Sequence, residues 1–206
     1  MRIPVDERRA ALAVAALRVI ARDGVHAATT RAIAAEAGMP LASLHYAYRS
    51  RDELLREAVA LVVAGEREAV AGLLDADGDE GAPPDIAPLV RAALGAYLDL
   101  LRAEPGREQG MLELTFHALR APGLDGVAQE QYAQYRGLVA ELFAAAAERC
   151  GIRWDTPVDA LARMAVAATD GLTVAWLVEG DEAGLDVQLD LVASAIVAHA
   201  VPEEEP

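Results

Sequence analysis

The chain has 206 residues, a net charge of −15 and an apolar content of 54%, and only 4% of its residues are aromatic. That length allows one or two domains with a sizeable core. Abundant alanine with few aromatic residues favours helix over sheet, so the predicted fold class is all-α. No uncharged stretch approaches the roughly 18 apolar residues of a membrane span, and the single cysteine, Cys150, excludes an internal disulfide. We therefore expect a cytoplasmic protein with no membrane partner.

Four helices are predicted in the N-terminal part of the chain. Thr29 is a suitable N-cap for a short helix, Pro40 suits the first turn of the next one, and Ser50 suits the cap of a longer helix. Gly24 and Gly38 end the helices that precede them. The predicted helices cover residues 6–23, 30–37, 41–48 and 51–74.

Residues 75–85, DADGDEGAPPD, combine glycine, proline and acid without periodicity and are predicted to be a linker. Apolar periodicity then predicts five further helices, at residues 86–102, 107–120, 127–150, 158–179 and 185–200. Thr156 is expected to cap the fourth of them, with Pro157 at its first position. No strand is predicted, and the tail after residue 200 is expected to be frayed.

Positive charge is concentrated near the N-terminus. Residues 1–56 hold nine arginines and six acids, a net charge of +3, and residues 57–206 hold nine arginines and 27 acids, a net charge of −18. A basic head on an acidic body indicates that only the head approaches a polyanion, although chance unevenness gives the same split. We therefore divide the chain into a head domain, residues 1–56, and a body domain, residues 57–206.

The two short helices of the head have the spacing of a helix-turn-helix. Such a motif needs a small residue on its first helix, a glycine where the turn takes a positive φ, and an aliphatic residue on the inner face of its second helix. Ala34, Gly38 and Leu44 meet these three needs, and Ile33 supplies a further core contact. The pattern is moderately specific, because alanine-rich helices produce parts of it by chance.

The same stretch resembles the N-terminal signature of the TetR family of transcriptional regulators. Between residues 8 and 56 the match is ordered and free of gaps, and its residues are Gly24, Thr29, Ile33-Ala34, Ala37-Gly38-Met39, Leu44-His45-Tyr46-Ala47-Tyr48 and Ser50-Arg51-Asp52-Glu53-Leu54. The sequence departs from the family pattern at Pro40, His45 and Ala47. The resemblance implies an N-terminal three-helix DNA-binding domain, followed by a helical domain that binds a small-molecule effector and forms a homodimer.

By this resemblance, helix 41–48 enters the major groove of a palindromic operator on double-stranded DNA. Tyr46 and His45 face outward if Leu44 and Tyr48 face inward, although Tyr46 could instead pack within the head. Arg51 opposes the dipole of its own helix, which favours a role toward a partner. The candidate DNA-binding residues are Thr30, Arg31, Leu41, Ala42, Ser43, His45, Tyr46 and Arg51. Thr29 is more simply a cap, and Tyr48 a core residue.

The body is expected to hold the effector site and the dimer interface. Polar, aromatic and sulfur-containing side chains at inward spacing are candidate effector contacts, each with a core or surface role as the alternative: Tyr97, Met111, Thr115, His117, Tyr135 and Asp170. The resemblance places the interface on the last two helices, with candidate residues Leu161, Met164, Ala168, Leu172, Trp176, Leu189, Ala193 and Ile196. It also implies that the regulator leaves the DNA when the effector binds, which in most members of the family ends repression.

An enzyme and a helical interaction protein are the two alternatives to a regulator. An enzyme is disfavoured, because HExxH, GxSxG, a glycine-rich phosphate loop and paired cysteines are all missing from the sequence. Glu113 and His117, four residues apart, could present two metal ligands on one helix face, but a metal needs more ligands, so no metal and no cofactor are expected. A helical interaction protein without DNA function is the second alternative, and the charge split and the signature argue against it.

Overall fold

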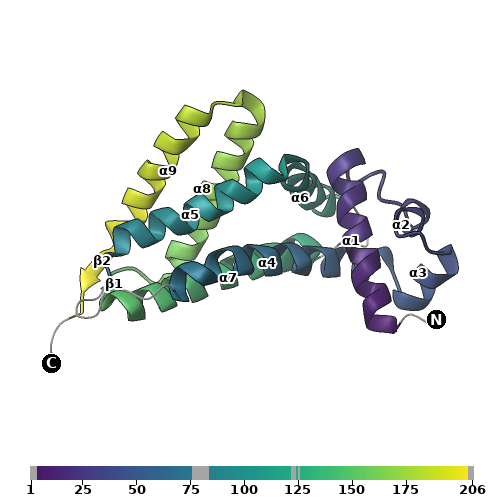
Figure 1. The fold of residues 1–206 in the computed structure, drawn as a ribbon, viewed down its shortest axis with the longest axis horizontal. Coiled ribbons are helices and arrows are strands. Elements are labelled where there is room, and N and C mark those ends of the chain that lie inside the picture. Colours follow the sequence, from purple (N-terminus) through teal and green to yellow (C-terminus); the bar gives the residue numbers. More distant parts are fainter. Residues whose placement is uncertain (1–3, 76–83, 122–123, 125, 204–206) are drawn as a thin grey trace. The chain divides into compact units, whose positions relative to one another are not determined.

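Nine helices and two short strands make up the part of the chain that this computed structural model describes, residues 4–75, 84–121, 124 and 126–203 (Figure 1). The predicted all-α class is confirmed. The elements group into two compact units. The first holds residues 1–64 and 103–134, and the second holds residues 65–102 and 135–206. The units therefore do not divide at residue 56, because residues 103–134 group with the N-terminal helices.

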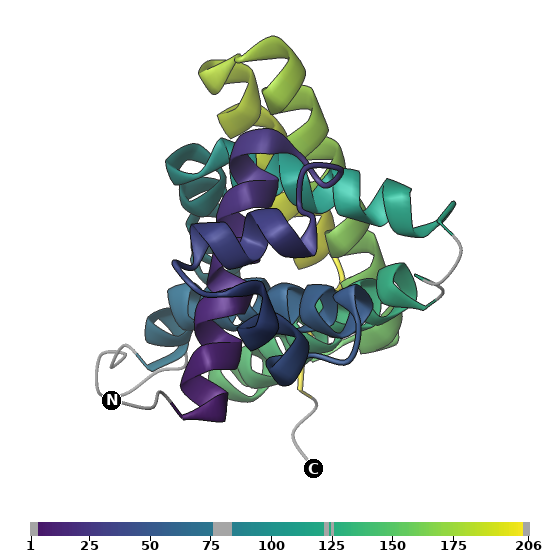
Figure 2. The same cartoon turned by 90° about the vertical axis from the view of Figure 1, so that its right-hand side faces the viewer.

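The first unit contains the head and one helix from the middle of the chain. Its elements are α1 (Val5–Asp23), α2 (Thr30–Glu36), α3 (Leu41–Ala47), the first part of α4 (Arg51–Asp75), α6 (Pro105–Ala118) and the start of α7 (Val127–Cys150). The purple α1 contacts both α2 and α3, drawn in dark blue in Figure 2, and also contacts α6. The expected caps are present, since Thr29 Oγ1 accepts from Ala32 N and Ser50 Oγ accepts from Glu53 N.

The second unit is built from α5 (Ile86–Ala103), the rest of α4 and α7, α8 (Val158–Glu179) and α9 (Glu182–Val197). Helices α8 and α9 contact each other. Two groups of buried apolar residues form its core. One contains Val90, Phe143, Ala146, Leu161, Ala165, Ala193 and Ile196, and the other contains Leu98, Leu101, Leu172, Leu185 and Leu189.

The structure differs from the sequence-based expectation at two helix starts and in the tail. Helix α6 begins at Pro105, and α9 begins at Glu182 because Asp181 caps it through Gly184 N. The tail is not frayed throughout, since β2 (Ala200–Pro202) pairs antiparallel with β1 (Ile152–Trp154). Within the expected linker, residues 76–83 lie outside the described residues.

Thr156 does not cap α8 as predicted. Its Oγ1 lies 2.9 Å from Asp155 Oδ1 and 3.1 Å from His199 Nδ1, and the residue before α8 is Pro157. His199 Nδ1 also lies 2.8 Å from Asp155 Oδ1. These contacts join the segment before α8 to the residue that precedes β2, and they engage the hydroxyl outside the helix.

Among the described residues one helix, α8, is long and apolar enough to cross a membrane by length and composition alone. The fold gives its composition another explanation. Leu161, Ala165 and Leu172 lie on a face that is buried in the core of the second unit, and a second, exposed face is also apolar.

Candidate nucleic-acid interface

Helix α3 is fixed by one face and presents the other to solvent. Leu44 is 1% exposed and Ala47 is also buried, whereas Tyr46 is 67% exposed. Ala42 and His45 are exposed as well, and Leu41 and Ser43 are half-buried. The five candidate residues of this helix therefore include its whole exposed face, with a hydroxyl, an imidazole and a phenol as hydrogen-bonding groups.

The anchoring of α3 depends on Arg9 of α1, a residue that the sequence reasoning did not single out. Its Nη1 donates to the carbonyl of Ala47 at 2.7 Å and to Glu53 Oε1 at 2.8 Å, and its Nε donates to Glu57 Oε2 at 3.0 Å. One guanidinium thus joins α1, the end of α3 and α4. An arginine is suited to this role because its planar fork carries five donors.

Tyr48 completes the same joint from the end of α3. It is 2% exposed, its hydroxyl donates to the Arg9 carbonyl at 2.8 Å, and the Arg9 guanidinium lies 4.2 Å from its ring centroid. Burial raises the pKa of the Tyr48 hydroxyl, so it stays protonated as a donor. The prediction that Tyr48 is a core residue is confirmed. On the exposed side, Arg8 lies 5.5 Å from the ring centroid of Tyr46.

The start of α2 presents a second candidate contact. Thr29 serves as the N-cap, Thr30 is half-buried, and Arg31 is exposed. The structure thus gives Thr29 a structural role and leaves the Arg31 side chain at the surface. A cationic side chain of this kind can contact DNA phosphate without reading a base.

Arg51 has protein partners that the sequence did not reveal. Its Nη2 donates to the Val25 carbonyl at 2.7 Å and its Nε donates to the Ala28 carbonyl at 3.0 Å. The need for a partner, inferred from its place in the first turn of α4, is therefore met within the chain. Its direct contact with a phosphate stays a prediction.

The second unit carries an exposed stripe without charge on α8 and α9. On α8 the stripe repeats at intervals of four and three residues and consists of Ala160, Met164, Ala167, Gly171, Val174 and Val178. On α9 it consists of Ala183, Val187, Leu191 and Ser194, and it continues at the C-cap residue Ala198. Val178 is 79% exposed and Leu191 is 66% exposed. Large exposed apolar residues in a continuous row mark an interaction surface. We call these residues the α8–α9 stripe.

The predicted interface residues fall mainly on the neighbouring face. Leu161, Leu172, Leu189, Ala193 and Ile196 are each no more than 6% exposed and lie in the core of the second unit. Ala168 and Trp176 are half-buried, and Met164 belongs to the α8–α9 stripe. Helix α8 has two adjacent apolar faces, and periodicity does not tell which of them the protein's own core covers. The location of a dimer interface stays a prediction.

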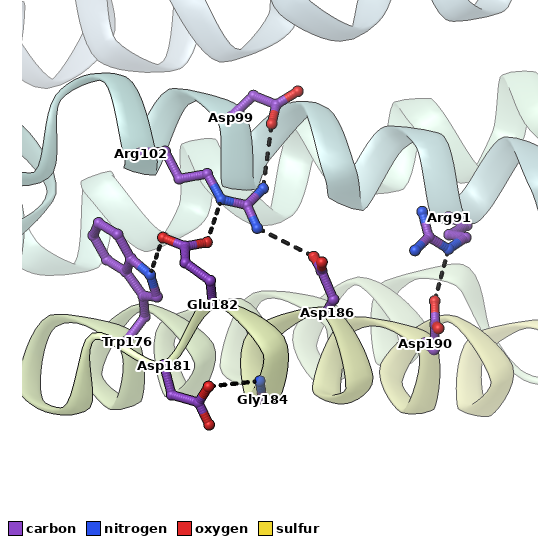
Figure 3. A network of polar contacts seen from close by, with 9 residues as sticks. All are labelled: Arg91, Asp99, Arg102, Trp176, Asp181, Glu182, Gly184, Asp186 and Asp190. Atoms are coloured by element: carbon purple, nitrogen blue, oxygen red, sulfur yellow. Dashed lines mark hydrogen bonds and ion pairs between the residues drawn. The ribbon is translucent and has the colours of Figure 1, made fainter.

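Figure 3 shows the ion pairs that join α5 to the acidic residues of α9. Arg102 of α5 donates to Glu182 Oε2 at 2.9 Å and to Asp186 Oδ1 at 3.1 Å, and Arg91 donates to Asp190 Oδ1 at 2.7 Å. The indole N–H of Trp176 donates to Glu182 Oε1 at 2.9 Å. The acidic row of α9 thus faces the arginines of α5, while the neighbouring stripe positions of α9 are exposed.

Three candidate effector residues lie in the first unit, and two of them are core residues. Met111 is 3% exposed, and Thr115 is buried, with its hydroxyl 3.0 Å from both the Met111 carbonyl and Gln131 Oε1. His117 is half-buried, and its ring meets that of His26 edge-on at 4.8 Å. Burial lowers the pKa of His117, helped by His26 and Arg51.

The other three candidate effector residues lie in the second unit, each half-buried. They are Tyr97 on α5, Tyr135 on α7 and Asp170 on α8. The Tyr97 hydroxyl lies 2.6 Å from Thr173 Oγ1, one turn along α8 from Asp170, and Thr173 is 2% exposed. A polar pair of this kind between two apolar helices can orient a ligand that enters beside it.

The pair of possible metal ligands, Glu113 and His117, is used within the protein. Glu113 Oε2 accepts from Val25 N at 3.2 Å, and His117 contacts His26. In the described part of the chain no group of three or more His, Cys, Asp or Glu side chains is arranged to hold a metal ion.

Comparison with known proteins agrees with this geometry. Residues 12–58 match the family described as bacterial regulatory proteins of the tetR family, and residues 86–201 match the C-terminal domain of BetI-type transcriptional repressors. The HTH-type nicotine-responsive transcriptional repressor HdnoR of Paenarthrobacter nicotinovorans is 31% identical over 153 residues, which cover 72% of this chain and 74% of that protein.

Two solved structures show the same fold. A putative TetR-family regulator from Rhodococcus sp. has a TM-score of 0.76 at 19% identity and covers 94% of this chain and 98% of its own. The multidrug binding protein EbrR complexed with ethidium has a TM-score of 0.65 at 26% identity, with 92% of this chain and 98% of that chain covered.

The anchored helix-turn-helix and the helical second unit define a DNA-binding transcriptional regulator. The matches at both ends of the chain make the assignment specific: the chain belongs to the TetR family of bacterial transcriptional regulators. This is a family of regulators and not of enzymes.

Proposed function

We propose that this regulator is a cytoplasmic repressor that binds an inverted-repeat operator as a homodimer and leaves it when a small molecule binds. The observation that carries the proposal is the rigid presentation of α3, whose inner face is buried while Tyr46 is 67% exposed. A recognition helix must be held in one orientation to read base edges.

Helix α3 would lie in the major groove. Ser43 supplies a hydroxyl, and Leu41 and Ala42 supply methyl groups for contact with thymine. His45, Tyr46, Thr30 and Arg31 would contact the phosphates on either side. Arg51 contributes by holding the residues before α2, with a direct phosphate contact as its further predicted role.

Two copies of the chain would pair through the α8–α9 stripe. The spacing of four and three residues on α8 is that of helices which pack at a shallow angle, and its alanines and glycine allow close approach. Two linked heads bind a two-fold symmetric site far more tightly than one head, because the second contact becomes intramolecular.

A small organic molecule would act as the effector, as nicotine does for HdnoR by its name. Tyr97, Tyr135, Asp170 and His117 remain the candidate contacts, since Met111 and Thr115 lie in the core of the first unit. A first panel would contain nicotine, imidazole, ethidium and malachite green, the last three being bound by EbrR in its structures. The readouts are the thermal unfolding temperature and the release of bound DNA.

Selection of bound sequences from a random double-stranded DNA library at physiological salt tests the proposal. The expected result is an inverted repeat with half-sites centred about 34–36 Å apart or a multiple of that distance. The proposal would be refuted if the folded, dimeric protein enriched no sequence, either without the panel compounds or in their presence. A helical interaction protein without DNA function would then be the better description.

A further inference from the structure

Helices α1 and α6 cross at a distance that only glycine allows. A Cβ atom on Gly106 would lie 2.5 Å from the carbonyl oxygen of Ala21, and one on Gly110 would lie 2.5 Å from Ile20 Cγ2. Real Cβ atoms do not approach other atoms so closely. The two glycines, one turn apart on α6, therefore set α6 directly against the last turn of α1.

One turn beyond this crossing, α6 holds the loop that follows α1. Glu113 Oε2 accepts from the backbone N–H of Val25 at 3.2 Å, and Gln109 Nε2 donates to Glu113 Oε1 at 3.3 Å. Gly24 has a φ of 83°, and a Cβ there would lie 2.8 Å from the same Glu113 oxygen. The positive φ requires glycine at this position, and a side chain here would also displace the Glu113 carboxylate.

The opposite side of the loop is held from α4. Arg51 donates to the carbonyls of Val25 and Ala28, so the backbone of Val25 is gripped at its N–H by Glu113 and at its C=O by Arg51. Ala28 is followed directly by the cap Thr29 and by Thr30 and Arg31. The loop that leads into the α2 N-terminus is therefore held by one side-chain hydrogen bond from α6 and two from α4.

The contacts that Glu113 and Arg51 make with the loop differ in number and length. The Glu113 side chain lines an open cleft of about 320 Å³ together with Asp23, His26 and Gln109, and its single bond to Val25 N measures 3.2 Å. Arg51 donates two shorter hydrogen bonds, at 2.7 Å and 3.0 Å, and the bonds of both side chains are charge-assisted. On the α6 side the loop therefore has one side-chain hydrogen bond, which a single substitution at Glu113 removes.

We propose that Glu113 is a positioning residue for DNA binding, which acts by holding Val25 and through it the N-terminus of α2. The inference rests on the proposed function, because it needs Thr30 and Arg31 to contact DNA. Glu113 itself touches no nucleic acid in this account. Its carboxylate is a negative charge near a DNA-binding surface, where removing it would by charge alone tighten binding, so a loss of affinity on its removal is a distinctive result.

Three variants distinguish the positioning role of Glu113 from the effect of its negative charge on DNA binding. Glu113→Ala removes the acceptor, Glu113→Gln removes the charge but keeps an acceptor oxygen for Val25 N, and Glu104→Ala removes an acid of the same unit that does not contact the loop. Dissociation constants would be measured on the selected inverted repeat and on random DNA. The oligomeric state and thermal unfolding temperature of each variant would be recorded as well.

The expected result is a roughly three- to tenfold weaker binding of Glu113→Ala to the selected site, the effect of one lost hydrogen bond. Glu113→Gln should recover most of that loss, and Glu104→Ala should bind at least as tightly as the unmodified protein. Equal or tighter binding by folded, dimeric Glu113→Ala would overturn the inference. If the unmodified protein itself selects no sequence, the proposed function has failed and not this role of Glu113 alone.

Discussion

The recognition helix α3 and the helix pair α8–α9 contrast in how clearly their sequences reveal which face is exposed. In α3 the outward residues His45 and Tyr46 differ in kind from the inward Leu44 and Ala47. In α8 the buried Leu161 and Leu172 and the exposed Met164 and Val174 are of one kind. A helix with polar and apolar sides specifies its orientation, whereas one that is apolar on two sides leaves the choice to its neighbours.

The largest effect is expected from a charge in the α8–α9 stripe. Val174→Glu would place a carboxylate in the contact between two copies, where it finds no partner and loses its hydration. We predict a monomer in sedimentation and at least about a 100-fold loss of affinity for the inverted repeat, since the linkage of two heads is lost. Ala144→Glu, which adds the same charge at an exposed site on α7, should leave both unchanged. A Val174→Glu dimer with full affinity would place the interface elsewhere.

A smaller effect, on stability, is expected at the glycine crossing of α1 and α6. Gly110→Ala would force a methyl group against Ile20, and overpacking of this kind costs about 1–3 kcal/mol. Gly137→Ala, on α7 with nothing within 4 Å of an added Cβ, should instead stabilise the protein by about 0.5–1 kcal/mol. Denaturant unfolding of both variants measures the difference. Unchanged or raised stability of Gly110→Ala would mean that the crossing is looser than described.

The salt dependence of DNA binding distinguishes Arg31 from Arg51. Arg31→Ala should lower the slope of log affinity against log salt by about one, the loss of one phosphate contact. Arg51→Ala should weaken binding to all sequences, and the phosphate contact predicted for it also requires a drop of about one in the slope. If its slope stays unchanged while affinity falls, its two carbonyl contacts account for its role. Arg163→Ala, exposed on α8, is the control.

The smallest effect concerns the pH dependence of stability. Burial lowers the pKa of His117 in the folded chain, so the unfolded chain takes up the proton first as the pH falls. The stability contributed by the neutral imidazole is therefore complete above the ordinary pKa of about 6.5 and declines below it. Unfolding at pH 7.5 and pH 5.5 should show a smaller loss for His117→Gln than for the unmodified protein. An equal loss would contradict the burial argument.

The sequence predicts the features that depend on a local pattern, and it does not predict those that depend on distant partners. Helix positions, the caps Thr29 and Ser50 and the inward Tyr48 were predictable, because each depends on a local pattern. The role of Arg9 was not, since its partners Glu53 and Glu57 lie more than 40 residues away and an arginine on α1 has no local signature. Nor could sequence show that Arg51 faces the carbonyls of Val25 and Ala28.

On α8 and α9 a usable signal was present but is subtler than hydrophobicity. The positions of the exposed stripe carry no charge, although they alternate along α9 with the acidic row of Glu182, Asp186 and Asp190. Once these acids are assigned to the arginines of α5, the uncharged positions are left facing outward. The two short strands were not predicted, because a strand of three residues is too short to show an alternating pattern.

The central claim is that two copies, joined by the α8–α9 stripe, place two α3 helices on one DNA site. Sedimentation of the protein with the selected inverted repeat, labelled on the DNA, measures how many copies bind. The account predicts two copies on the full repeat, and a single, weakly bound copy for Val174→Glu on a half-site. A single copy of the unmodified protein on the full repeat, bound with the affinity expected of two linked copies, would contradict the account.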